Sequence, residues 1–321
     1  MRIMVFDVPA EYGGALSILK QYYNDACADK DNEWIFVVSK PELPDTDNVK
    51  VARLPWTKKS WLHRLWFDNV YALQLVRKFK PDKVISLQNT MIKAGGCFQE
   101  LYVHQALPFC EKRFTFGENR KFWIYQNIIS KMIFRSVKKC DSIIVQTSWM
   151  KDAVVHKTGI REDKITIIPP KVNIQNDYLY KKTDEKIFFY PANAAVYKNH
   201  KAIYNAVYDL ISQGYKDFKV VLTLEKTEKN LEIEKKTGGI IEFAGYLPKE
   251  KINEYYSKSV LLFPSYVETF GLPLLEARVG GCPIIASDCA FSKEILDGYE
   301  KVDYISPFSI DDLVNVMKKY L

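Results

Sequence analysis

The chain has 321 residues and an ordinary globular composition, with 47% apolar and 26% charged residues. This composition excludes a disordered, collagenous or coiled-coil protein, and at about 100–200 residues per domain the length indicates two domains or one large one. Residues 1–170 hold 26 Lys and Arg against 18 Asp and Glu, whereas residues 171–321 hold 20 against 21. The basic excess of the first half predicts an anionic partner there, which could be a membrane surface, nucleic acid or phosphates.

The sequence carries no feature that predicts export or membrane insertion. No stretch approaches the roughly 20 apolar residues that a membrane span needs. The apolar start is interrupted by Asp7, so it favours a first strand over a signal peptide. The six cysteines form no C-x-x-C pair and the four histidines no H-x-x-x-H spacing. We therefore expect a cytoplasmic protein with free thiols and without a zinc site.

Short apolar runs alternate with helix-period stretches from end to end. In the first half we expect strands at 1–7, 34–39, 83–87, 100–105, 141–146 and 164–168, and helices at 14–27, 61–79, 119–139 and 148–158. In the second half we expect strands at 186–190, 218–224, 240–244, 259–263, 283–287 and 302–305, and helices at 199–213, 248–258, 272–279 and 309–320. This alternation predicts an α/β fold with parallel sheets that helices cover on both faces.

The alternation is interrupted after Pro169-Pro170, because paired prolines cannot continue a strand. A polar stretch follows and reaches as far as residue 186, so we expect a hinge at 169–186. The sequence thus predicts two doubly wound domains, residues 1–170 and residues 171–321. Ligands of such sheets bind outside the carboxyl ends of the strands, so the turns that follow strands are the places to search for chemistry.

The most informative turn follows the apolar run that ends at Phe263. Proline at position 273 and Gly271 predict a helix start there, where free backbone N–H groups and the helix dipole favour an anion. Glu268 lies in the turn and Glu276 about one turn into the helix, and two carboxylates at such a place suit the hydroxyls of a sugar. The alternative is that Glu268 only caps the helix and Glu276 is a solvated surface residue.

This segment, P-S-x-x-E-T-F-G-L-P-L-L-E-A followed by Gly280-Gly281-Cys282-Pro283, resembles the E-x7-E signature of a large family of retaining glycosyltransferases. That family includes sucrose synthase and the bacterial phosphatidylinositol mannosyltransferases. The resemblance implies the GT-B fold, which consists of two Rossmann-like doubly wound domains with an interdomain cleft. It implies that Glu276 holds the nucleotide ribose, and that the donor sugar contacts Glu268, Thr269, Phe270, Gly271 and Leu272.

Two further turns fit a phosphate or sugar ligand. Gly13-Gly14 precedes a helix, where glycines let backbone amides approach a ligand; the alternative is an ordinary turn. Lys198 lies in a strand-exit turn, where a fixed cation would stabilise a departing diphosphate; the alternative is a solvated lysine. The family carries an Arg six positions before this Lys, but the position is Ala192 here. Asn193 is a candidate substitute, as is another basic residue.

Other positions match the family less specifically. His104 ends a buried strand, where the family has a His beside the donor sugar; the alternative is a buried structural histidine. The loop Gly245-Tyr246-Leu247 resembles the family's loop against the nucleotide base, and Glu294 resembles a Glu downstream of the signature. Asp45-Thr46-Asp47 has the D-x-D pattern of metal-dependent glycosyltransferases, but no buried strand leads into it. We interpret it as a solvated turn and expect no metal.

The segment 55–67 mixes three tryptophans with basic residues. The helical spacing predicts that Leu62, Leu65, Trp66, Leu73 and Val76 belong to the core. The remaining residues would then suit lipid headgroups, and they are Trp56, Lys58, Lys59, Trp61 and Arg64. The alternative is a solvated face with the tryptophans packed inward. Nucleic-acid binding is not expected, because no binding motif accompanies the charge.

The sequence therefore predicts a retaining, metal-independent glycosyltransferase of bacterial surface-polysaccharide type, acting on a glycan or lipid-linked glycan. The donor would be a hexose or deoxyhexose on UDP, GDP or dTDP, and no cofactor is required. We expect a cytoplasmic location, peripheral at the inner face of the membrane. The helix that crosses back to the first domain in this family is expected to be curtailed, since the sequence ends directly after 309–320. The alternatives are an epimerase or hydrolase on the same fold and a non-catalytic sugar-nucleotide-binding protein.

Overall fold

The computed structural model describes residues 1–11, 13–172 and 178–321. The chain divides into two compact units, Met1–Pro170 and Lys171–Leu321. The expected hinge includes residues 173–177, and the glycine-rich turn includes residue 12, all of which lie outside the described residues. The two units are taken one at a time below.

Unit 1 is built on a seven-stranded sheet in the order β3-β2-β1-β4-β5-β6-β7, and every pairing is parallel. The strands are β1 (Arg2–Asp7), β2 (Glu33–Val38), β3 (Val49–Arg53), β4 (Lys83–Ser86), β5 (Phe98–Tyr102), β6 (Ser142–Val145) and β7 (Ile165–Ile167). The order reverses between β1 and β4, which is the switch point where ligands of such sheets bind.

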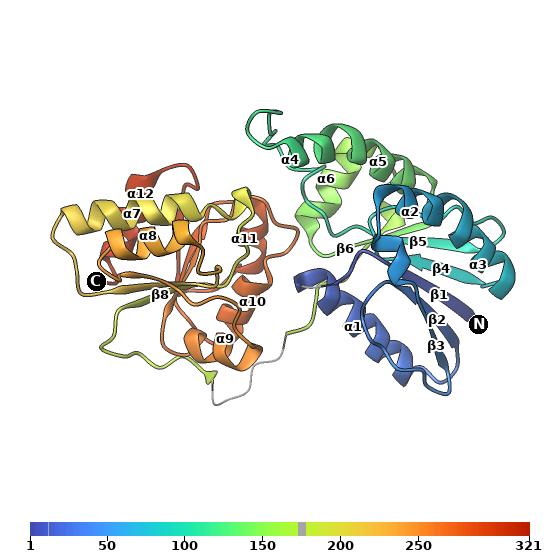
Figure 1. Ribbon diagram of the computed structural model, residues 1–321, viewed down its shortest axis with the longest axis horizontal. Coiled ribbons are helices and arrows are strands. Elements are labelled where there is room, and N and C mark those ends of the chain that lie inside the picture. Colours follow the sequence, from blue (N-terminus) through green and yellow to red (C-terminus); the bar gives the residue numbers. More distant parts are fainter. Residues whose placement is uncertain (12, 173–177) are drawn as a thin grey trace. The chain divides into compact units, whose positions relative to one another are not determined.

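The helices of unit 1 cover both faces of this sheet (Figure 1). Side chains of β1 alternate between two cores: Ile3 and Val5 pack against α1, whereas Met4 and Phe6 pack against Phe67 and the helix that follows it. The helical segments are α1 (Gly13–Ala28), η1 (Pro55–Lys58), α2 (Trp61–Trp66), η2 (Phe67–Tyr71), α3 (Ala72–Phe79), α4 (Arg120–Ile124), η3 (Tyr125–Ile129), α5 (Ser130–Lys139), α6 (Ser148–Thr158) and η4 (Glu162–Lys164).

The expected helices 61–79 and 119–139 are each interrupted by a π-helical turn, η2 and η3. A π turn inserts a residue into the helix and shifts which side chains face the sheet. The prediction that Leu62, Leu65 and Trp66 belong to the core is wrong, because their exposed fractions are 76%, 41% and 48%. Phe67, inside the π turn, is the buried side chain instead.

Unit 2 is built on a six-stranded parallel sheet in the order β10-β9-β8-β11-β12-β13. Its strands are β8 (Ile187–Tyr190), β9 (Lys219–Leu222), β10 (Ile241–Phe243), β11 (Val260–Phe263), β12 (Ile284–Ser287) and β13 (Val302–Ile305). Its helical segments are η6 (Val196–Lys198), α7 (His200–Ser212), α8 (Glu228–Lys236), α9 (Lys249–Tyr256), α10 (Leu272–Val279), α11 (Ala290–Ile295) and α12 (Ile310–Lys318). Helices α7, α8 and α12 lie on one side of the sheet and α9 on the other (Figure 1).

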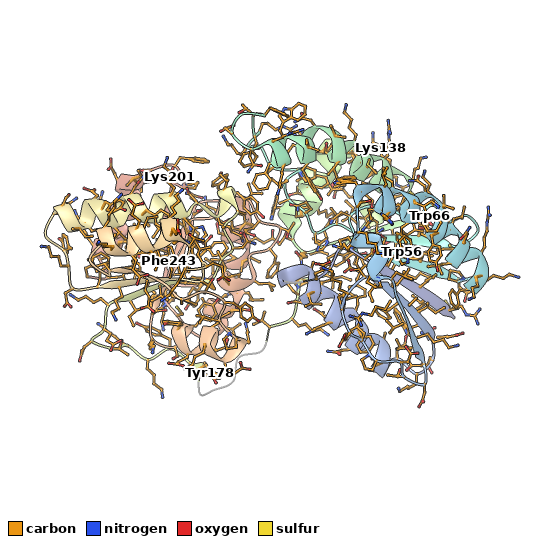
Figure 2. All side chains as sticks on the ribbon, viewed as in Figure 1. Trp56, Trp66, Lys138, Tyr178, Lys201 and Phe243 are labelled. Carbon is orange, nitrogen blue, oxygen red and sulfur yellow. The ribbon has the colours of Figure 1, made fainter. Side chains whose placement is uncertain are left out.

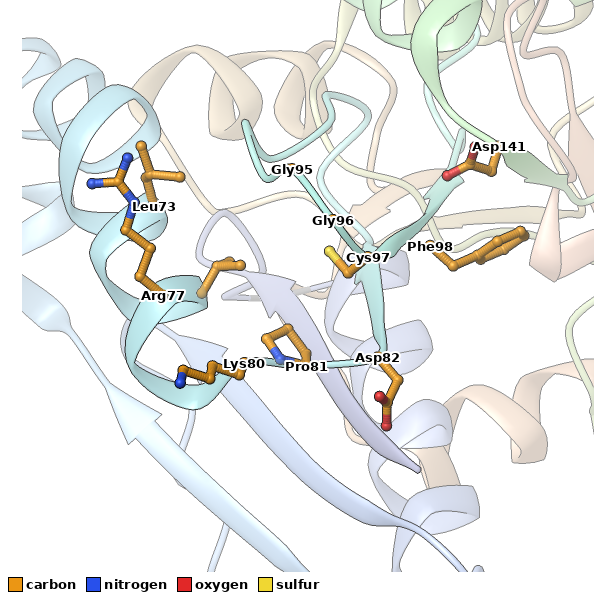
Figure 3. Close-up of a pocket in the computed structure, with 11 residues that line it drawn as sticks. Leu73, Arg77, Lys80, Pro81, Asp82, Gly95, Gly96, Cys97, Phe98 and Asp141 are labelled. Carbon is orange, nitrogen blue, oxygen red and sulfur yellow. The ribbon is translucent and has the colours of Figure 1, made fainter.

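An open cavity of about 1160 Å³ lies at the amino ends of the strands of unit 1 (Figure 3). Its lining includes Asp82 directly before β4, Phe98 at the start of β5 and Asp141 directly before β6. Ligands of parallel α/β sheets bind at the opposite, carboxyl edge. This cavity is therefore distinct from the turns that the sequence singled out.

Candidate functional site in the second unit

The switch point of the second sheet lies between β8 and β11, which pair directly in the register Val260↔Phe188 and Leu261↔Phe189. The turns that leave these two strands are therefore neighbours at the carboxyl edge. The first turn carries Lys198 and the second carries Glu268. Two of the predicted site residues, 70 positions apart in the sequence, are brought together in this way.

Glu268 and Lys198 form an ion pair through Oε1 and Nζ. The Ser265 hydroxyl also donates a hydrogen bond of 2.7 Å to Glu268 Oε1. Both charged side chains are largely buried, at 13% and 14% exposure, so solvent screens their attraction less than it would on an open surface. The pair places one anion and one cation side by side at the edge where a ligand would enter.

Hydrogen bonds between the two turns fix the position of this ion pair. The Tyr190 hydroxyl donates to the Lys198 carbonyl at 3.0 Å, and the Ser265 hydroxyl reaches the Tyr197 carbonyl at 3.2 Å. Asn199, whose φ is +62°, donates through Nδ2 to the carbonyls of Pro264 and Pro307 at 3.3 and 2.7 Å. Asn tolerates this left-handed conformation better than most residues. Lys198 is therefore held by its backbone as well as by Glu268.

The turn after Glu268 continues into α10 through Gly271, which has a φ of +89°. A Cβ atom at this position would lie 3.2 Å from Leu274 Cδ1 and 3.5 Å from the Phe263 ring, so glycine is required both by conformation and by space. No side chain caps the first turn of α10, and Pro273 lies within that turn. Pro273 has no N–H and the Leu274 N–H donates to the Gly271 carbonyl at 2.9 Å, so in this turn the Leu272 N–H is the backbone donor left for an anion.

Glu276 lies on α10 with its own set of partners. The buried Tyr256 hydroxyl donates to Glu276 Oε2 at 3.1 Å, and Lys249 forms an ion pair with Oε1. Glu276 is only 15% exposed, so the alternative of a solvated surface residue is wrong. Both partners come from α9, which directly follows the loop Gly245-Tyr246-Leu247. The Tyr246 side chain in that loop is 86% exposed and free to contact a ligand.

Ala192, at the position where the family carries an arginine, is buried. Asn193 is exposed, and its side-chain oxygen accepts a hydrogen bond of 3.0 Å from the Ala195 N–H, which folds it back onto its own turn. His200 is buried beside the Tyr190 ring at a centroid distance of 5.0 Å, and burial lowers the pKa of its imidazole to about 4. Its position agrees with a structural role.

The remaining predicted site residues belong to unit 1. Gly13 begins α1 with a φ of +62°, and Gly14 follows it with an exposed backbone. His104 lies just beyond β5, and its N–H donates to Asn89 Oδ1 at 2.8 Å. Burial lowers the pKa of the His104 imidazole to about 4, so this histidine is neutral at physiological pH. All three residues lie at the carboxyl edge of the first sheet.

Sequence reasoning missed the residues that hold the two glutamates and the Lys198 turn in place. Ser265 and Asn199 lie inside the two turns that the sequence singled out, and only their polar residue types could have indicated a role. Lys249 and Tyr256 carry no local signal, since both reach Glu276 from another helix.

Within the described ranges, no three His, Cys, Asp or Glu side chains gather in a way that could hold a metal ion. Asp45 accepts a hydrogen bond of 2.9 Å from the Val51 N–H, and both it and Asp47 are exposed. None of the described helices is long and apolar enough to cross a membrane.

Comparison with known proteins gives matches over both halves of the chain. Residues 174–321 match the family described as "Glycosyl transferases group 1", and residues 26–176 match "Glycosyltransferase Family 4". The O-antigen chain mannosyltransferase RfbU of Salmonella typhimurium is 27% identical over 220 residues, which make up 64% of this chain and 60% of that protein. The aligned region thus spans less than two thirds of this relative.

Many solved structures resemble this chain, among them WaaG and HepE, which match nearly its whole length. WaaG, a glycosyltransferase involved in lipopolysaccharide biosynthesis, has a TM-score of 0.75 at 15% identity, covering 100% of this chain and 90% of that one. HepE of Anabaena, solved in complex with UDP and glucose, has a TM-score of 0.67 at 13% identity, covering 99% and 89%. At such identities the likeness shows the fold, which is GT-B as the sequence resemblance implied.

Proposed function

We propose that the chain is a retaining glycosyltransferase of GT-B fold that acts in bacterial surface-polysaccharide synthesis. It would transfer a hexose or deoxyhexose from a nucleotide-sugar donor to a glycan or lipid-linked glycan. The observation that carries this proposal is the buried Lys198–Glu268 ion pair at the switch point of the second sheet. The UDP complex of HepE supports a nucleoside diphosphate as the leaving group.

In this proposal each part of the site has its own role. The diphosphate lies at the start of α10, where the Leu272 N–H and the helix dipole favour its charge. Lys198 neutralises the charge that grows on the leaving phosphate, so it stabilises the transition state more than the ground state. Glu268, with Thr269, Phe270, Gly271 and Leu272, contacts the donor sugar. Glu276 accepts hydrogen bonds from the ribose hydroxyls.

Retention of the anomeric configuration without an enzyme nucleophile implies that the acceptor hydroxyl attacks from the face that the diphosphate leaves. The leaving phosphate would take the proton of that hydroxyl. The neutral His104 imidazole of unit 1 is able to donate one hydrogen bond and to accept another. Lys198 and the Leu272 N–H of α10 would stabilise the diphosphate in place of a metal ion. UDP, GDP and dTDP all remain candidate carriers.

Removal of the Glu268 carboxylate tests the proposal. We expect Glu268→Gln to abolish sugar transfer while nucleoside diphosphate binding, measured by calorimetry, is retained. Glu232→Gln, which removes an exposed carboxylate on α8, is the matched control and should transfer sugar normally. Full transfer by Glu268→Gln would contradict the catalytic role. Donor hydrolysis or epimerisation without transfer in the parent protein would favour the alternative enzymes on this fold.

The acceptor side of the proposal places the protein at the inner face of the cell membrane. Unit 1 holds the basic excess of the chain, with 26 basic against 18 acidic residues up to position 170. A lipid-linked acceptor is confined to the bilayer, so peripheral contact would raise the local concentration of enzyme at its substrate. Vesicle binding measures this contact separately from the chemistry.

A further inference from the structure

Two helical segments of unit 1 present large apolar side chains to solvent. On α2, the exposed fractions of Trp61, Leu62 and Trp66 are 68%, 76% and 48%. On the second segment, Ile128 of η3 and Met132 of α5 are 53% and 44% exposed. These large apolar side chains are exposed to water in the folded chain, and a contiguous exposed apolar patch marks an interaction site.

A pocket of about 430 Å³ connects the two segments. Leu65 contributes from α2 and Met132 from α5, while Met91 comes from the loop after β4. Leu65 and Met132 thus line one hollow, and we call this hollow, together with the exposed side chains Trp61, Leu62 and Trp66 on α2 and Ile128 on η3, the α2–α5 surface. Trp66 on α2 and Lys138 on α5 can be followed in Figure 2.

Three cations line the same pocket: Lys93, Arg135 and Lys139. Arg135 and Lys139 have no ion-pair partner among the described residues. Lys93 donates to Asn69 Oδ1 at 2.5 Å. The acid in the lining, Asp68, is already paired with Arg64 at 2.7 Å. Helix α5 holds four basic residues and no acidic one. The pocket thus combines an apolar wall with positive charge that no carboxylate neutralises.

This arrangement differs from the headgroup surface that the sequence predicted. Trp56 packs against Trp66 and Tyr71, with ring centroids 5.2 and 5.3 Å apart. Lys58 forms an ion pair with Glu11, and Arg64 pairs with Asp68. Trp61 and Lys59 remain exposed from the predicted set. The unpaired cations come instead from α5 and the β4 loop.

We propose that the α2–α5 surface docks the protein onto a bilayer that contains anionic phospholipid. Lipid phosphates lie among Lys93, Arg135 and Lys139, and acyl chains contact Leu65 and Met132. Trp61 and Trp66 sit at the headgroup level, where amphipathic rings are enriched. Charge complementarity favours this occupant over a second copy of the chain, because two such surfaces would repel each other. The inference rests on the proposed membrane location and is independent of the donor chemistry.

Flotation of the full chain with vesicles tests the proposal. The parent protein is expected to float with vesicles of phosphatidylcholine mixed with phosphatidylglycerol, and to bind phosphatidylcholine alone weakly. The double variant Arg135→Gln/Lys139→Gln should lose about tenfold or more in partitioning onto the anionic vesicles. Lys20→Gln/Lys30→Gln removes the same charge on the α1 side of the sheet and should bind like the parent. High salt should reduce binding of the parent to the level of the charge variant.

The apolar half of the surface needs its own variant. Leu62→Ser alters an exposed side chain, so the fold should persist, and we expect weaker binding at both low and high salt. Equal binding by the Arg135/Lys139 variant and the parent would overturn the proposal, as would equal binding to both vesicle types. A parent protein that forms a salt-resistant dimer, with Leu62→Ser monomeric, would instead assign the surface to a second copy. Nucleoside diphosphate binding by each variant, measured in parallel, reports separately on the proposed transfer function.

Discussion

At the scale of single residues, the ion pair between Lys198 and Glu268 carries the proposed chemistry. Each member occupies a turn that hydrogen bonds hold in place, so neither charge needs to be positioned when the donor binds. Preorganised charge of this kind acts on the transition state without reorganisation during the reaction. The missing arginine at Ala192 makes Lys198 the principal cation of its turn.

We expect Lys198→Gln to lower the turnover number for sugar transfer by about 10²–10³, the range for loss of one preorganised electrostatic contact. Nucleoside binding should change little, because the lysine faces the phosphate. Steady-state kinetics at saturating donor measure the effect. Lys201→Gln, an exposed lysine on α7, is the control. An unchanged turnover in Lys198→Gln would remove this residue from the mechanism.

Asp7, at the end of β1, gives unit 1 a pH-dependent stability. Burial raises the pKa of its carboxyl group from 3.8 to about 8, and the nearby charges of Arg64 and Lys58 offset only part of this increase. The folded state therefore holds a proton that the unfolded state has released above about pH 4, and stability falls as pH rises from about 4 to about 8.

The Asp7→Asn variant removes this titration. We expect its free energy of unfolding to exceed that of the parent at pH 8, by on the order of 5 kcal/mol, and the gain to disappear near pH 4. Urea unfolding at several pH values measures the difference. A parent stability that rises between pH 5 and pH 8, with Asp7→Asn following it in parallel, would show that Asp7 is ionised in the fold.

At the scale of elements, Gly271 sets the start of α10. Alanine at this position would adopt an unfavourable positive φ and press its Cβ against Leu274 and Phe263. We expect Gly271→Ala to cost about 1–2 kcal/mol in stability and to weaken diphosphate binding, since the first N–H of the helix would move. Thermal unfolding and calorimetry with a nucleoside diphosphate measure the two effects.

Gly159→Ala provides the matched control, because Gly159 also has a positive φ but lies at the end of α6 in unit 1 with open space around it. It should lose similar stability and bind the diphosphate normally. If both variants bind alike, the start of α10 does not form the phosphate site.

The elements also show what a sequence can predict. Buried strands such as β8 and β11 are continuous apolar runs, and the sequence located them. The edge strand β3 was missed, because most of its side chains are partly or fully exposed and no apolar run marks it. Helix α8, which has no buried side chain, was missed for the same reason. The π turns η2 and η3 have no sequence signal, and Leu62 and Leu65, which precede η2, are exposed where the helical spacing had predicted core positions.

The residues of the candidate site also fall into those that the sequence predicted and those that it did not. Glu268, Gly271 and Glu276 were found because one contiguous segment carries them. Lys249 and Tyr256, which fix Glu276, could not be found, because their contact spans two helices and depends on the packed fold. A motif therefore names candidate ligand-binding groups, whereas the groups that hold them in place depend on the packed fold.

At the scale of the whole molecule, the net charge is distributed unevenly between the two units. Unit 1 holds the basic excess and the α2–α5 surface, while unit 2 is nearly balanced and holds the two signature glutamates. This separation fits a protein that meets an anionic membrane with one unit and a nucleotide sugar with the other. The sequence predicted the charge difference and the two sheets, whereas the α2–α5 surface required the structure.

The most direct test of the donor site is a crystal structure of the full chain with a bound nucleoside diphosphate sugar. We expect the diphosphate at the start of α10 within hydrogen-bond distance of Lys198 Nζ, the ribose hydroxyls on Glu276 and the sugar against Glu268. Density for the diphosphate elsewhere, with Glu268 still paired only to Lys198 and Ser265, would contradict the proposed donor site.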